Sequence, residues 1–166
     1  MVGTLVHRYL ELMAKDGTNH WPRSRILALM EPAMRWLKTR GLPESECNHS
    51  ASEVLQALEI ATTSPTGQWI LKSRDEERNE WALNQVVDTE VHSLRMDRTF
   101  VENGIRWIID YKVVRLNGPG KVETLLGENA EGHRAQLSRY AALFPDETVR
   151  KAIYYLLQDH LLVLED

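Results

Sequence analysis

Residues 93–115 read SLRMDRTFVENGIRWIIDYKVVR, in which two runs rich in β-branched and aromatic residues flank Asn103-Gly104. Asn-Gly is the pair that best tolerates positive φ at both central positions of a two-residue type I′ turn. The stretch therefore predicts an antiparallel hairpin of strands 89–101 and 105–115, in which Glu102 faces Ile105 beside the turn.

This register places Asp97 directly across from Asp110 on the partner strand. Side chains alternate between the two faces of a strand, so Lys112 shares a face with Asp110. Two carboxylates that face each other across a strand pair destabilise it unless a positive charge lies between them. The hairpin therefore predicts a divalent cation between Asp97 and Asp110.

Two other interpretations of the hairpin stay open. A bulge near the turn would shift the pairing by one residue and send one carboxylate to the opposite face. Alternatively, this is an ordinary solvated hairpin whose charged side chains point at water. The run Trp107-Ile108-Ile109 favours a catalytic or metal-binding role, because it indicates an inner strand, where Asp and Lys seldom occur without a purpose.

The rest of the chain predicts a helical first half and a mixed second half. Periodicity and capping signals predict three helices, at 3–14, at 22–41 with a break at Pro32, and from Ser50 or Ser52 to 62. Turn and strand signals then predict a turn at 64–67, a short strand at 69–71 and a core strand at 79–84. After the hairpin we expect a loop at 116–123, a helix at 131–144 and two strands at 148–157 and 161–164.

Composition sets the limits on function. The chain has 166 residues and a net charge of −4, so it has the size of one domain and no overall attraction for nucleic acid. Cys47 is the single cysteine, which excludes an internal disulfide and a four-cysteine iron–sulfur cluster. Gly120-Lys121 lacks the spacing of a phosphate-binding loop, so we expect no ATP site. With no signal peptide and no apolar run long enough for a bilayer, we expect a cytoplasmic protein without a membrane partner.

Four short motifs occur in order along the chain: Gly3-Thr4-Leu5-Val6-His7, Asp97, Asp110-Tyr111-Lys112 and Gln136-Leu137-Ser138-Arg139-Tyr140. With the sequences MDRTF and GIRWIIDYK around the hairpin, this order resembles the RecB-like nucleases, a branch of the PD-(D/E)xK superfamily that is often fused to the C-terminus of UvrD/Rep-type helicases. The resemblance spans nearly the whole chain. One departure is Val113-Val114, where relatives often place Thr or Ser.

The resemblance implies an α/β fold with a restriction-endonuclease-like core, in which helices flank a mixed central sheet that carries the antiparallel catalytic hairpin. It implies a single nuclease domain over 1–166, with a mainly helical part at 1–63 and a sheet core with the Gln-xxx-Tyr helix at 79–164. By the same analogy, the chain is a fragment of a larger helicase.

The resemblance also assigns roles at a metal site. Asp97, Asp110 and Lys112 would be catalytic, and the two carboxylates would bind Mg²⁺, which Mn²⁺ can replace. At a helix edge, His7 is by default a packing or surface residue, but the resemblance makes it a third side-chain ligand. The backbone carbonyl of Tyr111 is a further candidate ligand.

A second group of residues is assigned to DNA. Gln136 and Tyr140 are four residues apart and share a helix face, so their default role is packing. The resemblance instead implies that they line the DNA groove, with Arg134 and Arg139 as phosphate contacts on the same helix. Glu80 matches a position where the family commonly has Glu, and it is a possible member of the site.

Taken together, the motifs imply a metal-dependent DNA nuclease, in particular an exonuclease, that belongs to an ATP-dependent helicase–nuclease of DNA repair and recombination. Its partners would be DNA and helicase motor domains in the same polypeptide or complex. Two alternatives stay open. One is a degenerate nuclease domain that serves as a non-catalytic DNA-binding or protein-docking scaffold. The other is a binding module for a small acidic ligand or another protein.

Overall fold

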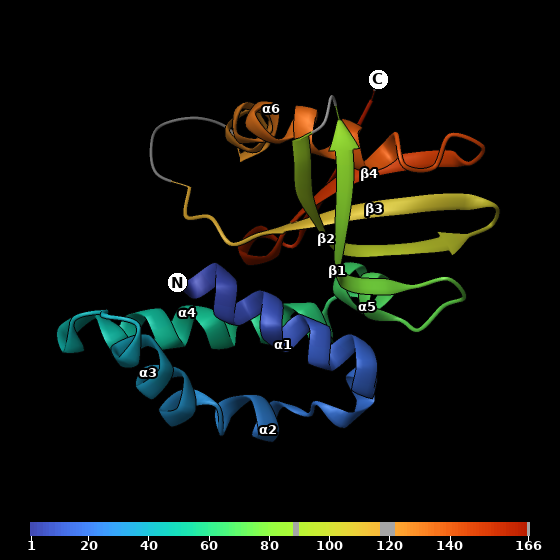
Figure 1. Ribbon diagram of the computed structural model, residues 1–166. Coiled ribbons are helices and arrows are strands. Elements are labelled where there is room, and N and C mark those ends of the chain that lie inside the picture. Colours follow the sequence, from blue (N-terminus) through green and yellow to red (C-terminus); the bar gives the residue numbers. More distant parts are fainter. Residues whose placement is uncertain (88–89, 117–121, 166) are drawn as a thin grey trace. The chain divides into compact units, whose positions relative to one another are not determined.

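The computed structural model describes residues 1–87, 90–116 and 122–165, which group into two compact units (Figure 1). The helical unit comprises Met1–Ser73, Lys112–Arg115 and Leu156–His160. The sheet unit comprises Arg74–Tyr111, Leu116–Tyr155 and Leu161–Asp166.

The helical unit is organised around the long helix α4 (Glu44–Thr63). Four other helices pack against it: α1 (Val2–Asp16), α2 (Arg23–Leu27), α3 (Met30–Thr39) and α5 (Pro65–Leu71). Two short 3-10 helices, η1 (Thr18–His20) and η2 (Leu156–Gln158), complete the unit. Ala51, Ala57 and Ala61 of α4 are completely buried, and their small size lets neighbouring helices approach closely.

The first helices differ little from the prediction. Helix α1 covers the predicted range 3–14, and it buries Val6, Leu10 and Met13 on one side. The interruption between α2 and α3 falls at residues 28–29 and not at Pro32. Pro32 instead lies in the first turn of α3, where the missing N–H is not needed.

The expected start of α4 at Ser50 or Ser52 is wrong. The helix begins at Glu44, and both serines lie inside it. Ser50 is buried, and the hydroxyl of Ser52 donates a 2.9 Å hydrogen bond to the carbonyl of Asn48. A serine inside a helix can satisfy its hydroxyl on the preceding turn, so it is not by itself a start signal.

The expected turn at 64–67 and strand at 69–71 are also wrong, because this segment is helix α5. Ser64 is its N-cap, and its hydroxyl oxygen accepts a 2.9 Å hydrogen bond from the backbone N–H of Gly67. Pro65 follows at the first helical position, where proline is favoured. Ser64-Pro65 is therefore a helix start.

Gly67 is the closest contact between α5 and α4. A Cβ atom at this position would lie 2.6 Å from Ala61 Cα and closer still to the Ala61 carbonyl oxygen. Because both atoms belong to the backbone, we expect Gly67→Ala to lower the free energy of unfolding by about 2 kcal/mol or more. Urea denaturation followed by circular dichroism would measure this.

Gly132, in the interior of the helix after the hairpin, is the matched control. It is exposed, and a Cβ atom at this position would meet no atom of the described residues within 4 Å. Gly132→Ala should therefore stabilise the chain by up to about 1 kcal/mol through helix propensity alone. If both substitutions had the same sign, the close approach of α5 to α4 would not be the cause of the loss.

The sheet unit contains a five-stranded mixed sheet in the order β1-β2-β3-β4-β5 (Figure 1). Its strands are β1 (Arg78–Val87), β2 (Glu90–Glu102), β3 (Ile105–Lys112), β4 (Thr148–Tyr155) and β5 (His160–Leu164). Helix α6 (Val122–Ala141) packs against β4, whose residues 152–155 are buried. The predicted α/β class with a mixed sheet is confirmed.

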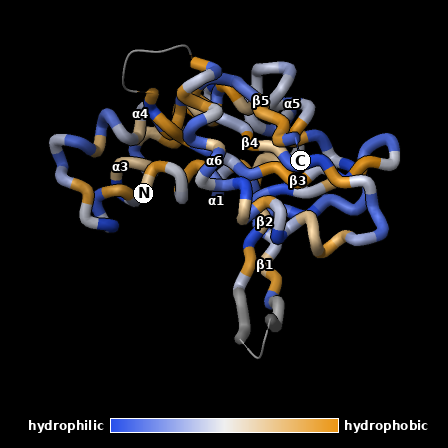
Figure 2. Tube along the Cα trace, turned by 90° about the horizontal axis from the view of Figure 1, so that it is seen from above, coloured by the Kyte–Doolittle hydropathy of each residue, from blue (hydrophilic) through white to orange (hydrophobic). Residues whose placement is uncertain are grey.

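The hairpin of β2 and β3 has the predicted turn and register. Asn103 and Gly104 have φ values of 53° and 73°, as a type I′ turn requires. The pairs run from Glu102↔Ile105 to Arg98↔Ile109 without a bulge. Strands β1 and β2 continue as a two-stranded ribbon that extends beyond β3 (Figure 2).

Helix α6 is longer than predicted, since it begins at Val122 and not near residue 131. Gly127 lowers the helix propensity of its first half, which hid this half in the sequence. Most of the expected loop at 116–123, including Gly120-Lys121, lies outside the described residues. The two predicted closing strands are confirmed as β4 and β5.

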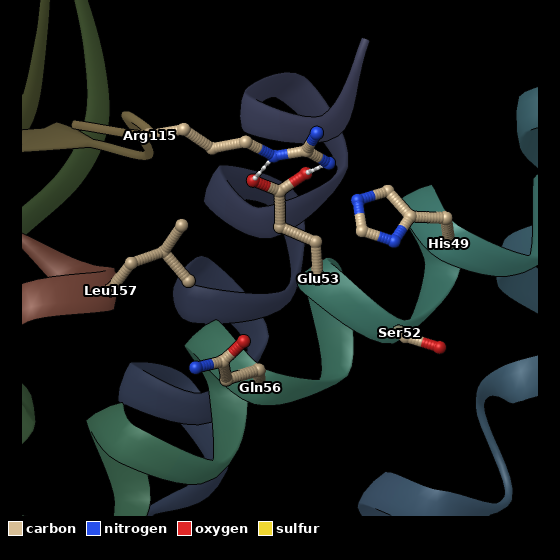
Figure 3. Close-up of a pocket in the computed structure, with 6 residues that line it drawn as sticks. All are labelled: His49, Ser52, Glu53, Gln56, Arg115 and Leu157. Carbon is tan, nitrogen blue, oxygen red and sulfur yellow. Dashed lines mark hydrogen bonds and ion pairs between the residues drawn. The ribbon is translucent and has the colours of Figure 1, made fainter. Parts of the chain in front are cut away.

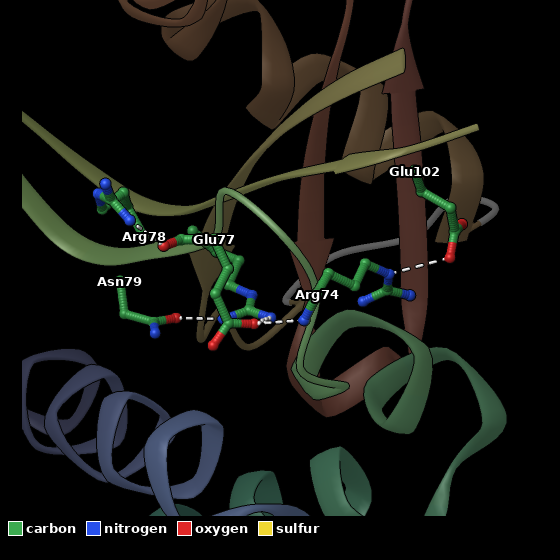
Figure 4. Close-up of polar contacts among 6 residues, drawn as sticks. Arg74, Glu77, Arg78, Asn79 and Glu102 are labelled. Atoms are coloured by element: carbon green, nitrogen blue, oxygen red, sulfur yellow. Dashed lines mark hydrogen bonds and ion pairs between the residues drawn. The ribbon is translucent and has the colours of Figure 1, made fainter. Parts of the chain in front are cut away.

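Three arginines that are almost completely buried tie the segment before β1 to the sheet (Figure 4 shows part of this network). Each is paired with carboxylates of the sheet unit, and the pairs are Arg74–Glu102 at 2.9 Å, Arg98–Glu77 at 3.0 Å, and Arg106 with Glu76 and Glu147 at 2.7 Å each. Aromatic rings lie near all three guanidinium groups, Phe100 near Arg74 and Arg98 and Phe144 near Arg106.

Within the part of the chain that the structure describes, no helix has both the length and the hydropathy that a membrane span requires.

Candidate functional site

Two carboxylates lie together where the ladder between β1 and β2 is interrupted. Pairing is regular up to Asn79↔Arg98 and resumes in the same register at Trp81↔Met96, so Glu80 faces Asp97 across the gap. A carboxylate oxygen of Glu80 and one of Asp97 lie within 4.8 Å of each other. Like charges opposed in this way destabilise a strand pair.

Glu80 departs from strand geometry, since its φ is 46°. A residue with a side chain seldom adopts this left-handed conformation inside a strand, and it costs about 1–3 kcal/mol. Glu80 Oε2 forms a 2.7 Å ion pair with Nε of Arg95, which is two residues before Asp97 on β2. Among the described strand residues, Glu80 is the one non-glycine residue with a positive φ, and it lies opposite another carboxylate.

Asp97 is held by the backbone of the next strand. Its Oδ2 accepts a 2.7 Å hydrogen bond from the N–H of Tyr111, which fixes the orientation of the carboxylate. Burial raises the pKa of the Tyr111 hydroxyl, and the negative charges of Asp97 and Glu80 raise it further, while Arg98 opposes them. The phenol therefore stays protonated beside the two carboxylates.

Asp110 lies on β3 and is only 4% exposed. The ladder ends at Arg98↔Ile109, one position before the predicted pair Asp97 and Asp110. Burial and the nearby charge of Asp110 raise the pKa of Tyr155 to about 12. Lys112 is the last residue of β3, two positions beyond Asp110.

Gln136 and Tyr140 of α6 are connected to this region through hydrogen bonds. The side-chain amide of Gln136 donates to the hydroxyl of Tyr140 at 2.6 Å. The same hydroxyl donates to the backbone carbonyl of Arg95, also at 2.6 Å. The Gln-xxx-Tyr pair thus contacts the residue whose side chain is bound to Glu80.

Arg134 and Arg139, the expected phosphate contacts, lie on the same helix. Arg134 pairs with Glu131 and donates to the backbone carbonyl of Glu165 at 3.0 Å. It borders a cavity of about 310 Å³ whose other lining residues are Ser138, Lys151, Leu164 and Glu165. Arg139 is exposed on α6.

His7, the expected third ligand, lies on α1 in the helical unit and is partly exposed. That unit also holds a separate cavity of about 180 Å³, shown in Figure 3. Arg115 and Glu53 close one side of it with a two-point ion pair of 2.8 and 2.6 Å. None of the predicted site residues lines this cavity.

The donor set of the sheet unit fits a hard divalent cation. Carboxylate oxygens are the ligands that Mg²⁺ and Mn²⁺ prefer, and Glu80 and Asp97 bring two of them within 4.8 Å. The guanidinium of Arg95 on Glu80 shows that a positive group is accommodated at this position.

Sequence reasoning underestimated Glu80 and did not find the contacts of Arg95. The position of Glu80 opposite Asp97 follows from the register of β1 and β2, but the sequence between these strands, Asp88-Thr89, lacks the Asn-Gly signal that would have predicted that register. The contact between Arg95 and Tyr140 is a tertiary contact over 45 positions, for which the sequence offers no local signal.

Comparisons of the chain with protein-family models and with curated proteins find no match.

Proposed function

We propose that the chain is a metal-dependent nuclease that hydrolyses DNA phosphodiester bonds, and an exonuclease in particular. The observation that carries the proposal is the pair Glu80 and Asp97, whose carboxylate oxygens lie within 4.8 Å at a strained break of the ladder. Strain and opposed like charges both cost stability, so a ligand that uses them is the simplest reason for their presence.

Asp97 and Glu80 would hold the cation, with Asp110 of the Asp-Tyr-Lys motif as a further carboxylate. The sequence resemblance adds His7 and the backbone carbonyl of Tyr111 as candidate ligands. When bound, the cation supplies positive charge at the scissile phosphate and acidifies water. The hydrogen bond from the backbone N–H of Tyr111 holds the Asp97 carboxylate in one orientation.

Lys112 would neutralise the charge that develops on the phosphate, or orient the attacking water. The resemblance further supports a setting in which helicase motor domains deliver DNA to this site during repair and recombination. A motor that feeds the strand would compensate for the net charge of −4, which gives no overall attraction for DNA.

The test is cleavage of end-labelled single-stranded and double-stranded DNA with Mg²⁺ or Mn²⁺. We expect cleavage by the parent chain that EDTA abolishes and that the Asp110→Ala variant lacks. Mn²⁺ binding without cleavage would indicate a site that binds the metal but needs helicase motor domains to deliver DNA. If calorimetry found no Mn²⁺ binding and DNA stayed intact, the nuclease proposal would be wrong and a non-catalytic scaffold would take its place.

A further inference from the structure

Arg95 contacts both Glu80, one of the two opposed carboxylates, and Tyr140 of helix α6. Its Nε lies 2.7 Å from Glu80 Oε2, and its backbone carbonyl accepts a 2.6 Å hydrogen bond from the Tyr140 hydroxyl. Tyr140 is buried and is itself contacted by Gln136, so the main chain of Arg95 is held in place. These hydrogen bonds do not fix the side chain of Arg95.

The exposure of the two partners differs strongly. The Arg95 side chain is 68% exposed, whereas Glu80 is 13% exposed. An ion pair with one partner in water contributes at most about 1 kcal/mol to stability. A contribution to stability therefore does not explain why Arg95 is paired with Glu80, the glutamate opposite Asp97.

Charge balance gives a better reason. Glu80 and Asp97 carry two negative charges within 4.8 Å, and the guanidinium offsets one of them. A divalent cation would offset both, but it would have to bind the same Glu80 carboxylate that the guanidinium contacts. Arg95 and the cation are thus competitors for the same carboxylate.

A displaced Arg95 would remain close to the site. It lies two residues before Asp97, so the two side chains start from the same face of β2. A guanidinium is planar and binds phosphate oxygens in a two-point arrangement, which suits the substrate class of the proposed nuclease.

We propose that Arg95 exchanges partners during the reaction: it neutralises Glu80 before a divalent cation binds, and it contacts the substrate phosphate once the cation has taken its place. In this arrangement the Gln136–Tyr140 pair acts as a positioning element, because it fixes the main chain from which the arginine swings. This inference rests on the proposed function and names a residue that would contact the substrate phosphate at the same site.

The test is calorimetric titration of the full chain with Mn²⁺ at physiological salt. Removal of the competitor in Arg95→Ala should tighten the Mn²⁺ Kd by about three- to fivefold, as expected from the strength of an exposed ion pair. The control is Arg78→Ala, which removes an exposed arginine of β1 that bonds to the Glu77 carbonyl. It should change the Kd less than about twofold.

A second readout is DNA cleavage at saturating Mn²⁺, which Arg95→Ala should slow by about tenfold or more through the lost phosphate contact. Tighter metal binding combined with slower cleavage is a combination that a merely structural residue would not give. An unchanged or weaker Mn²⁺ Kd in Arg95→Ala would overturn this inference and leave the proposed function standing. If the parent chain bound no Mn²⁺, the proposed function itself would fall, and the inference with it.

Discussion

Asp97→Asn should weaken Mn²⁺ binding at least about tenfold and slow DNA cleavage by about 10²- to 10³-fold, because it removes one charged ligand from a preorganised site. The substitution preserves shape. An asparagine oxygen can still accept the hydrogen bond that the N–H of Tyr111 donates to Asp97 Oδ2. A loss of activity would therefore result from the missing negative charge and not from a disturbed hairpin.

The same substitution should raise stability in EDTA. Asp97 and Glu80 place two negative charges within 4.8 Å, a repulsion of about 1 kcal/mol in high dielectric. Asp97→Asn removes this repulsion, while Asp97→Ala also strands the Tyr111 N–H and should lose about 1–3 kcal/mol. Thermal unfolding of both variants in EDTA would separate the two effects. Cleavage by Asp97→Asn at the parent rate would rule out Asp97 as a ligand.

The parts of the fold that could be predicted are those with strong local chemistry. Asn103-Gly104 selects one turn type, and that turn fixes the register of β2 and β3. Helix α1 shows a clear apolar side, and the closing strands are rich in β-branched and aromatic residues. In these segments propensity, pattern and turn chemistry agree.

Other segments were missed because two local signals compete. Ser64-Pro65 occurs in turns and also at helix starts, and the packing of Gly67 against Ala61, which the sequence does not show, adds to the capping by Ser64 in favour of the helix. At the site, the hairpin directs attention to Asp97 and Asp110, whereas the carboxylate that lies near Asp97 across the other strand pair is Glu80. Its left-handed φ is imposed by tertiary structure, which no strand pattern reveals.

Arg98→Met should lower the free energy of unfolding by about 3 kcal/mol, the largest stability effect that we expect for a polar residue of the sheet unit. Arg98 is 0% exposed, and it donates to Asn79 at 2.7 Å and to Glu77 at 3.0 Å. Methionine is apolar and can fill part of the space of the arginine. The loss in the free energy of unfolding should therefore come mainly from the charge of Glu77, which is left without its partner Arg98. Because Glu77 is 23% exposed, water relieves part of that cost, and we take the lower end of the usual range.

A double-mutant cycle makes the cause explicit. Glu77 Oε2 also accepts a 2.8 Å hydrogen bond from the backbone N–H of Arg74, and Glu77→Gln keeps an oxygen for this bond while it removes the charge. Arg98→Met should therefore cost less in a Glu77→Gln background, by about 1–2 kcal/mol. In a chain of 166 residues, a loss of about 3 kcal/mol corresponds to a fall in Tm of roughly 6–12 °C. The exposed Arg78→Met should stay within about 0.5 kcal/mol of the parent. Equal losses for Arg98→Met in both backgrounds would show that packing against Phe100, and not the ion pair, makes this arginine necessary.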